Sequence, residues 1–310
     1  MLWDRDRALD KTGGLPWPHG ASPPESADPE AVYDHLLLPS PPPDRPYVFI
    51  NMVATVDGKA TLLQAGHRGP IGSAVDRAVM VRLRLHADAV LRGAATVRHN
   101  PRYPGVPQAV EELRRRRGLA GQPLACTVSA TGHLQAGWPF FRQAPRLPVV
   151  FVGPGCSPED ERQLREVAEV HRAPAPGHGE GPPQPPGGRG AGEAGGAVPV
   201  DWMLRVLRER HGVRWLLCEG GPTLNFHLFR GGCVDELFLT VTPRVAGGRG
   251  ELTAVAGDSF LVPPARLELL SAFLHEDELF LRYRVRQDPP PGPGPAPAAV
   301  PGAASGPAGT

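Results

Sequence analysis

Apolar residues along the chain gather in short continuous runs. The run over residues 47–54 (YVFINMVA) is typical of a central strand that is covered on both faces of its sheet. Comparable runs lie at 87–91, 124–128, 148–152 and 213–218. These five runs are predicted to be strands, because they are short and bounded by polar or turn-forming residues.

Segments with helical spacing separate several of these runs. Ser73 is a suitable N-cap for a helix to about His86, and Ser157 followed by Pro158 is the expected start of a helix to about Val167. Further helices are predicted over 201–210 and 223–229. Strands that alternate with helices indicate an α/β domain with a mostly parallel central sheet flanked by helices.

The C-terminal part of the pattern differs. Residues 234–242, 266–274 and 278–286 are strand-like and have no helix between them. The sheet is therefore expected to finish with antiparallel strands at its C-terminal edge. An apolar edge at 236–241 would favour aggregation if it were bare, so a homodimer built on it is predicted.

The strand-to-helix junction at 216–226 (LLCEGGPTLNF) is the most informative stretch. Two glycines end the apolar run, and Pro222 stands where the first residue of a helix is expected. Free N–H groups and the positive end of the helix dipole would attract an anion there, so the junction is a candidate phosphate site. Taken alone, it is equally typical of an ordinary tight turn.

Composition narrows the class of protein. The 310 residues carry 33 Lys and Arg against 32 Asp and Glu, so no overall charge favours nucleic acid or an anionic membrane as a partner. The basic run at 114–117 is more typical of a solvated helix face than of a nucleic-acid site.

Four widely spaced cysteines without a Cys-x-x-Cys pair indicate reduced, buried thiols. With no apolar leader or membrane-length segment, a soluble cytoplasmic protein is expected.

The 39 prolines and 38 glycines concentrate in three segments, 13–46, 173–199 and 287–310. These contain too few apolar residues to form a core. The predicted organisation is an N-terminal extension over 1–44, one domain over 45–288 with a disordered insertion at about 173–199, and a disordered tail over 289–310.

Common catalytic motifs are missing from the sequence. The His178-Gly179-Glu180 triplet lies in the predicted insertion and has no Pro-Cys-x-x-Cys partner, so no metal site is expected. Neither a Gly-x-Ser-x-Gly elbow nor a Walker loop is present. What remains is a set of residues after predicted strands: Asn51, Asp57, Thr96, Ser129, Gly153 and Glu219.

Strand ends of this kind gather along one crevice in an open parallel sheet, which could hold a dinucleotide and a small polar substrate. Each residue also has an ordinary alternative. Asp57 and Ser129 are common turn residues, and Thr96 could cap a short helix.

Several motifs in order resemble the pyrimidine reductases of riboflavin biosynthesis, whose domain is related in fold to dihydrofolate reductase. The similarity covers about residues 46–286. The motifs are TVDGK at 55–59, IGS at 71–73 before a helix with Asp76, Arg77 and Arg84, LRGAATV at 91–97, EGGPTL at 219–224, VDEL at 234–237 and PRVAGG at 243–248.

This resemblance implies an NADPH-dependent reduction of 5-amino-6-(5-phosphoribosylamino)uracil to its ribitylamino form. It implies substrate contacts from Arg68, Arg84 and Glu219. Asp57 is the candidate for polarising or protonating the reacting site, and its competing role is to hold the turn. The implied cofactor-binding residues are Ala54, Thr96, Asn100, Ser129, Gly220, Gly221, Pro222, Thr223 and Leu224.

Departures from the family pattern keep other functions open. The segment His99-Asn100-Pro101 is shorter than the family's and lacks its acidic pair. A reductase of the same fold with another pyrimidine or pterin-like substrate, and a nucleotide-binding paralogue without turnover, are the alternatives. Arg98 is a candidate for binding a cofactor 2′-phosphate.

Overall fold

The computed structural model describes residues 3–4, 33, 36–62, 70–175, 197–250 and 252–286. Within them, ten strands form one sheet: β1 (Trp3–Asp4), β2 (Tyr47–Thr55), β3 (Ala89–Gly93), β4 (Leu124–Ser129), β5 (Val149–Val152), β6 (Glu169–Arg172), β7 (Trp215–Cys218), β8 (Glu236–Thr242), β9 (Arg266–His275) and β10 (Glu278–Arg286). The helices are α2 (Ala74–Arg84), α3 (Ala94–His99), α4 (Gln108–Arg116), α5 (Pro139–Arg142), α6 (Pro158–Arg165), α7 (Val200–His211) and α8 (Pro222–Arg230).

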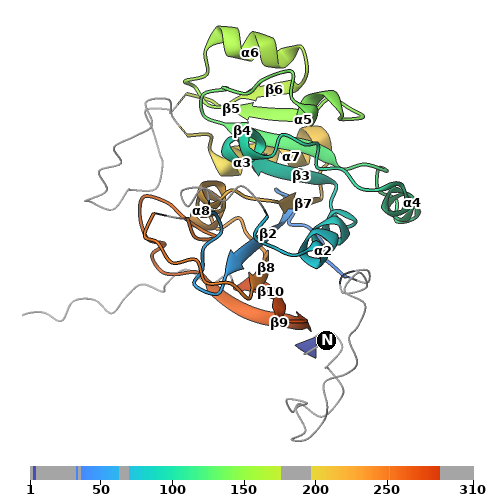
Figure 1. Ribbon diagram of the computed structural model, residues 1–310. Helices are drawn as coiled ribbons and strands as arrows, with labels where there is room; N and C mark the ends of the chain where they lie inside the picture. Colours follow the sequence, from blue (N-terminus) through green and yellow to red (C-terminus); the bar gives the residue numbers. More distant parts are fainter. Residues whose placement is uncertain are drawn as a thin grey trace, which may run out of the picture.

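The strand order is β1-β9-β10-β8-β2-β7-β3-β4-β5-β6, and Figure 1 shows it running from β6 at the top to β9 near the bottom. All pairs from β8 to β6 are parallel, whereas β10, β9 and β1 join antiparallel. The predicted fold class, a mostly parallel sheet flanked by helices with antiparallel strands at one edge, is confirmed.

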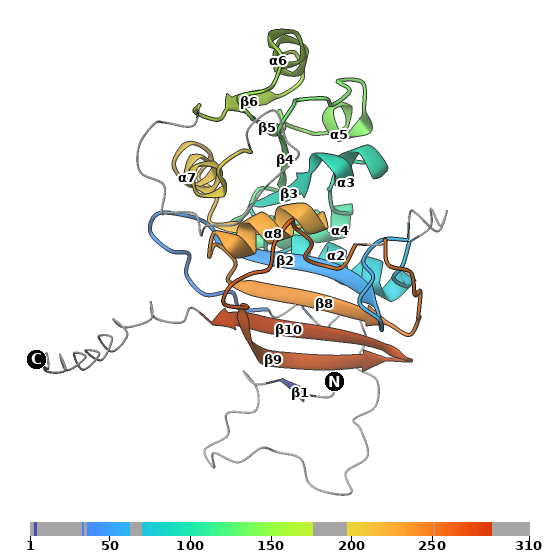
Figure 2. The ribbon, with the colours of Figure 1, turned by 90° about the vertical axis from the view of Figure 1, so that its left-hand side faces the viewer.

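Alternate residues of the strands build two apolar layers, because successive side chains of a strand point to opposite faces. Ile50, Leu91 and Leu216 belong to the layer covered by α7 and α8. Their neighbours face α2 or, further along the sheet, α3, α5 and α6. Figure 2 shows α7 on one side of the upper strands and α3 and α5 on the other. Burial on both faces explains the continuous apolar runs in the sequence.

The C-terminal strands are arranged differently from the prediction. Residues 236–241 were expected at a sheet edge, but β8 pairs with β2 on one side and with β10 on the other. That prediction is wrong, because the β9–β10 hairpin adds outside β8 and satisfies its backbone. The predicted homodimer therefore has no free strand at 236–241 to use.

Four short elements, β1, α3, α5 and β6, were not predicted. They contain two to six residues each. β6 has only Val170 as an aliphatic position, so its sequence carries almost no strand signal. β6 therefore forms because it pairs with β5 at one end of the described sheet, and not because its own sequence favours a strand.

Described parts of the predicted extension and insertion pack on the domain. Tyr33 is buried, with its ring edge-on to Phe238 and Phe273. At the two ends of the predicted insertion, Ala173 is buried and Val198 packs against the core. Residues 176–196 and 287–310 lie outside the described residues.

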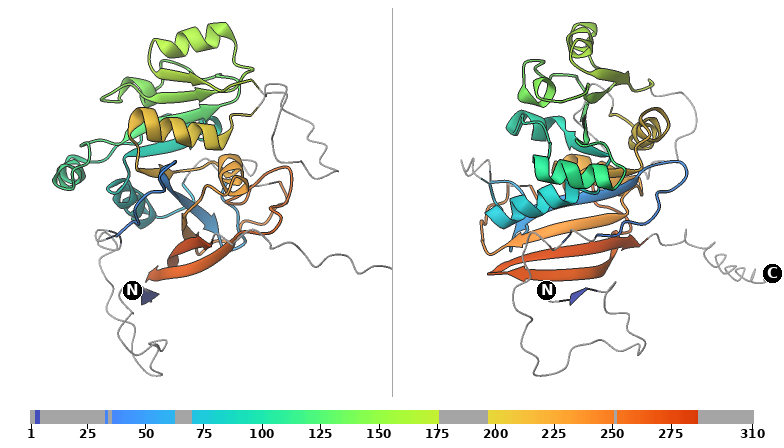
Figure 3. Two further views of the ribbon diagram at one scale, coloured as in Figure 1. Left: turned by 180° about the vertical axis from the view of Figure 1, so that it is seen from behind. Right: turned by 90° about the vertical axis from the view of Figure 1, so that its right-hand side faces the viewer.

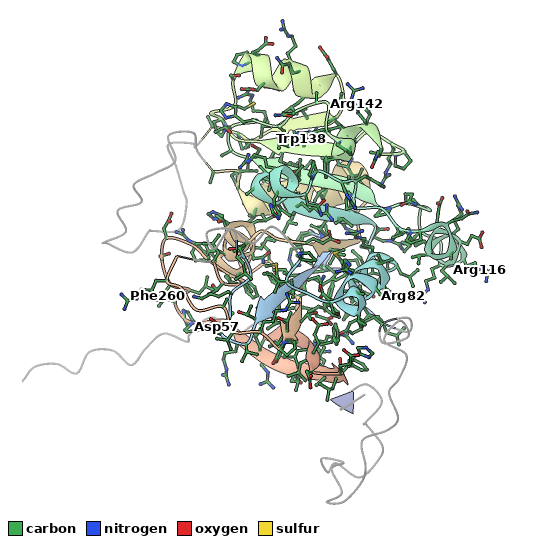
Figure 4. All side chains as sticks on the ribbon, in the orientation of Figure 1. Asp57, Arg82, Arg116, Trp138, Arg142 and Phe260 are labelled. Carbon is green, nitrogen blue, oxygen red and sulfur yellow. The ribbon has the colours of Figure 1, made fainter. Side chains whose placement is uncertain are left out.

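The sequence suggested that the basic run at 114–117 is a solvated helix face. The structure shows that the run is not uniformly exposed to solvent. Arg114 is fully buried and donates hydrogen bonds to the backbone carbonyls of Arg84, Ala87, Ala120 and Gly121. It therefore ties α4 to the turn between α2 and β3. Arg116 is exposed at the outer end of α4, as Figure 4 shows.

All four cysteines are buried and unbridged, as predicted. Among the described residues, no helix combines the length and apolar character that a membrane span requires.

Candidate active site

A cavity of about 860 Å³ opens at the carboxyl ends of the central parallel strands. Asn51 of β2, Arg92 of β3, Ser129 of β4 and Glu219 after β7 all contribute to its wall. These strands are neighbours in the sheet, so their ends meet at one place, as expected for a ligand site in an open α/β sheet. The predicted crevice is therefore present.

One wall of the cavity is the start of α8. Gly220 has a φ of +75°, which a residue with a side chain rarely adopts. Gly221 occupies the N-cap position without a capping side chain, and Pro222 is the first helical residue. A Cβ atom on Gly221 would lie 3.1 Å from the Thr96 hydroxyl oxygen. The glycines therefore leave the helix N-terminus open to the cavity, which is the arrangement that binds anions.

Next to this turn lies a buried cluster of two arginines and one carboxylate, of which Arg92 and Glu219 line the cavity. Arg84 of α2 holds both oxygens of Glu219, through Nε at 2.6 Å and Nη2 at 3.0 Å. Arg92 donates from Nε and Nη2 to the second of these oxygens, at 2.8 and 2.5 Å. The remaining nitrogens bond to the carbonyl oxygens of Arg102 and Gly105. The cluster thus joins β3, α2, the end of β7 and the 102–105 segment.

The electrostatics of the cluster favour its ionised form. Burial acts to raise the pKa of Glu219, but the charges of Arg84 and Arg92 and their hydrogen bonds outweigh it and lower that pKa to about 2. With two guanidinium groups and one carboxylate, the cluster carries a net positive charge, and Arg92 presents it to the cavity. This wall suits an electron-rich or anionic ligand group.

Asp76 of α2 is the second carboxyl group among the described residues that line the cavity. Burial raises its pKa to about 6; the charge of Glu278 adds to this, and a hydrogen bond from Thr240 opposes it. Glu278 is itself held by the hydroxyl and backbone N–H of Ser73, the N-cap residue of α2. A carboxyl group with a pKa near neutrality inside a cavity can exchange a proton with a bound ligand.

Most of the predicted site residues line this cavity. They are Thr96, Asn100, Ser129, Glu219, Gly221, Pro222, Thr223 and Leu224. Gly220 shapes the turn, while Ala54 is buried in β2 and does not line the cavity. Arg84 also does not line it, and its guanidinium contacts Glu219, Gly105 and Met80. Arg68 lies outside the described residues.

Asp57, the predicted catalytic residue, is exposed and is not part of the cavity wall. Its carboxylate accepts hydrogen bonds from the Thr55 hydroxyl and from the backbone N–H groups of Ala246 and Gly247. These bonds lower its pKa to about 2. Figure 4 shows Asp57 at the end of β2 beside the C-terminal loop. This placement favours the alternative role, in which Asp57 holds the turn.

Arg92 and Asp76 are the site residues that sequence reasoning did not select. Both lie within motifs that the sequence analysis noted, at 91–97 and after 71–73. Arg92 stands at the end of a buried strand, and a buried cation needs a partner of opposite charge. Its position could therefore have marked it as a site residue. Asp76 sits in the first turn of a helix, where an acidic residue is common and gives no catalytic signal.

The fold and the cavity have the features of a nucleotide-binding α/β domain. Comparison with known proteins is more specific: the chain belongs to the RibD C-terminal domain family, whose model matches residues 46–279. The family resemblance inferred from the motifs is confirmed.

Two curated relatives share the name 2,5-diamino-6-ribosylamino-4(3H)-pyrimidinone 5′-phosphate reductase. The protein from Methanothermobacter thermautotrophicus is 29% identical over 78% of this chain and 99% of its own length. The one from Archaeoglobus fulgidus is 30% identical over 70% and 89%. A crystal structure of a pyrimidine reductase-like protein from Corynebacterium diphtheriae has the same fold, with a TM-score of 0.63, 24% identity, and coverage of 79% of this chain and 94% of that one.

Glu219→Gln should destabilise the domain by about 3–5 kcal/mol, because it leaves two buried guanidinium groups facing a neutral amide. Urea unfolding at pH 7 measures this loss. Glu159→Gln, which removes an exposed partner of Arg162, is the control and should leave the unfolding midpoint unchanged.

The same variant tests the electrostatics. The pKa of Glu219 in the folded state, about 2, lies below its ordinary value of 4.5. Its contribution to stability is therefore present above pH 4.5 and is lost as the pH falls toward 2. The Glu219→Gln variant should lack this part of the acid dependence. Equal stability of the variant and the unaltered protein at pH 7 would contradict the conclusion that Glu219 is a buried, ionised partner of Arg84 and Arg92.

Proposed function

We propose that this protein is an NADPH-dependent reductase of a 5′-phosphorylated ribosylamino-pyrimidine in riboflavin biosynthesis. The observation that carries the proposal is one cavity that is lined both by an open helix N-terminus and by Arg92, Glu219 and Asp76. The first feature suits the phosphates of a nucleotide, and the second suits a polar ring beside a group that takes up a proton. Family membership and the names of the two archaeal relatives support the same activity.

The substrate has two candidate forms, which differ at one ring position. The sequence analysis predicted the deaminated uracil form, whereas the relatives are named for the 2,5-diaminopyrimidinone. The reacting ribosylamine is common to both. We take the diamino form as the first candidate, since the relatives are matched over 89% or more of their length.

The residues along the α8 wall fit a nicotinamide dinucleotide. The N-terminal turn at Gly221, Pro222 and Thr223 would receive its diphosphate, and Thr96 lies directly against this turn. Arg98 and the residues after β4 extend the same wall, so Arg98 is our candidate for a 2′-phosphate. When bound, the nicotinamide supplies the hydride.

The reaction takes up one hydride and one proton. The C1′–O4′ bond of the ribosylamine breaks, O4′ takes the proton, and the nitrogen lone pair forms a C1′=N iminium bond. Hydride adds to C1′ and returns that electron pair to nitrogen. The open-chain ribitylamine is the product.

Asp76 is our candidate for the proton donor. Its carboxyl group, with a pKa of about 6, is in part protonated near neutral pH and regains its proton from solvent. Arg92 orients the substrate, and Arg84 acts through Glu219 by holding that carboxylate in place.

A spectrophotometric assay of NADPH oxidation tests the proposed function. Both pyrimidine ribotides are offered to the purified full-length protein, and NADH replaces NADPH in parallel. Oxidation should require a ribotide, should be faster with the diamino form, and should favour NADPH. Binding of NADPH without turnover of either ribotide would contradict the reductase assignment and indicate another substrate or a silent paralogue.

The pH dependence of turnover tests the role of Asp76. A donor with a pKa of about 6 is protonated below that value, so kcat/KM should fall by about tenfold per pH unit above it. Asp76→Asn should lower kcat by about 10²-fold or more and remove this dependence. Asp57→Asn should keep it. If Asp57→Asn removed the dependence and Asp76→Asn kept it, Asp57 would be the donor.

The homodimer and the cytoplasmic location stay predictions. The described strands offer β6 and β1 as sheet edges, and neither was the edge predicted for the dimer.

A further inference from the structure

A cluster of three ligand-type side chains lies away from the cavity, where β6 meets the end of α7. Glu169 and His171 belong to β6, and His211 is the last residue of α7. Among the described residues, this is the group of histidine, cysteine and carboxylate side chains whose ligand atoms come close enough to hold a metal ion. Neither the proposed reductase activity nor the family assignment uses it.

The three ligand atoms form a compact triangle. His171 Nε2 and His211 Nε2 are 2.9 Å apart, and Glu169 Oε1 lies 3.2 Å from the first and 3.7 Å from the second. A point about 2.0–2.1 Å from all three atoms therefore exists, roughly 0.7 Å out of their plane. That offset is about the one that three ligands of a tetrahedral zinc ion require.

The surroundings hold the two imidazoles in place. His171 stacks on Phe151 with ring centroids 5.5 Å apart, and its ring is nearly perpendicular to that of His211. The side chains of His171 and His211 are 9% and 11% exposed, whereas Glu169 is 53% exposed. The imidazoles are thus fixed by packing, and the carboxylate side of the cluster faces solvent, which provides an entry path.

The charge state of the histidines also suits metal binding. Burial lowers the pKa of both His171 and His211; the charge of Glu169 opposes this shift, and nearby arginines add to it. Neutral imidazole is the form that binds metal ions. Without a metal ion, one neutral imidazole could donate its Nε2–H to the unprotonated Nε2 of the other. This hydrogen bond is the alternative explanation for the 2.9 Å contact between His171 and His211.

We propose that Glu169, His171 and His211 bind a divalent transition-metal ion, with zinc as the first candidate. Two imidazoles and one carboxylate are a ligand set for zinc, and the solvent side leaves room for a water as fourth ligand. The ion would join β6 to the C-terminal end of α7, two elements that flank residues 173–199 in the sequence. Figure 3 shows α7 packed across the sheet below β6 in its left view.

Binding of zinc to the full-length protein, produced without a histidine tag and freed of metal by a chelator, tests the proposal. Isothermal titration should show one zinc ion per chain and no binding of Mg²⁺. Zinc in large excess should raise the melting temperature by roughly 5 °C or more. Co²⁺ at the same site should give the strong visible absorption of tetrahedral coordination.

Glu169→Gln, His171→Gln and His211→Gln should each weaken zinc binding by roughly tenfold or more. His133→Gln is the matched control. His133 Nε2 lies 3.5 Å from Asp160 Oδ2, but the His133 side chain is 71% exposed. The His133→Gln variant should bind zinc like the unaltered protein. The Glu169 variant keeps the test valid if a histidine variant fails to fold. Absence of zinc binding, or zinc binding unchanged in all three variants, would show that the cluster is only a hydrogen-bonded pair.

Discussion

The buried contact of Glu219 with Arg84 and Arg92 is the interaction on which the site depends. It joins the end of β7 to α2 and β3, and it fixes the segment over 102–105 through carbonyl contacts. A buried ion pair of this kind adds little net stability compared with apolar packing, but loss of one partner is costly. Its value here is positional, since it holds one charged guanidinium at the cavity wall while both oxygens of Glu219 remain satisfied.

The second constraint is the close approach of backbone at the start of α8. Gly93 donates from its N–H to the carbonyl oxygen of Gly220 at 2.8 Å, so β3 and the glycine turn are in direct contact. Gly220 has a φ of +75°, and a Cβ atom on it would lie 2.9 Å from the Met52 sulfur, so a side chain there would strain the turn. The open N-terminus of α8 and the charged cluster therefore face one cavity because glycine allows the strand and the turn to pack this closely.

The sequence was sufficient for the parts of the fold that rest on local pattern. Continuous apolar runs located the central strands to within about two residues, and the glycine-proline junction located the start of α8. It was insufficient where residues distant in sequence determine the structure. Examples are the place of 236–241 inside the sheet, the burial of Arg114, and the ion pair of Arg84 with a residue 135 positions away. No local pattern shows that Asp76 is half-buried near Glu278, or that His171 meets His211 across 40 positions.

The most direct test of this account is a crystal structure of the protein with NADP⁺ and the ribitylamino product bound. We expect the cofactor diphosphate on the N–H groups at the start of α8. We also expect the pyrimidine ring against Arg92, with the ribityl chain within hydrogen-bonding reach of Asp76. Either ligand bound away from the cavity, or a pyrimidine that displaces Arg84 from Glu219, would contradict this account.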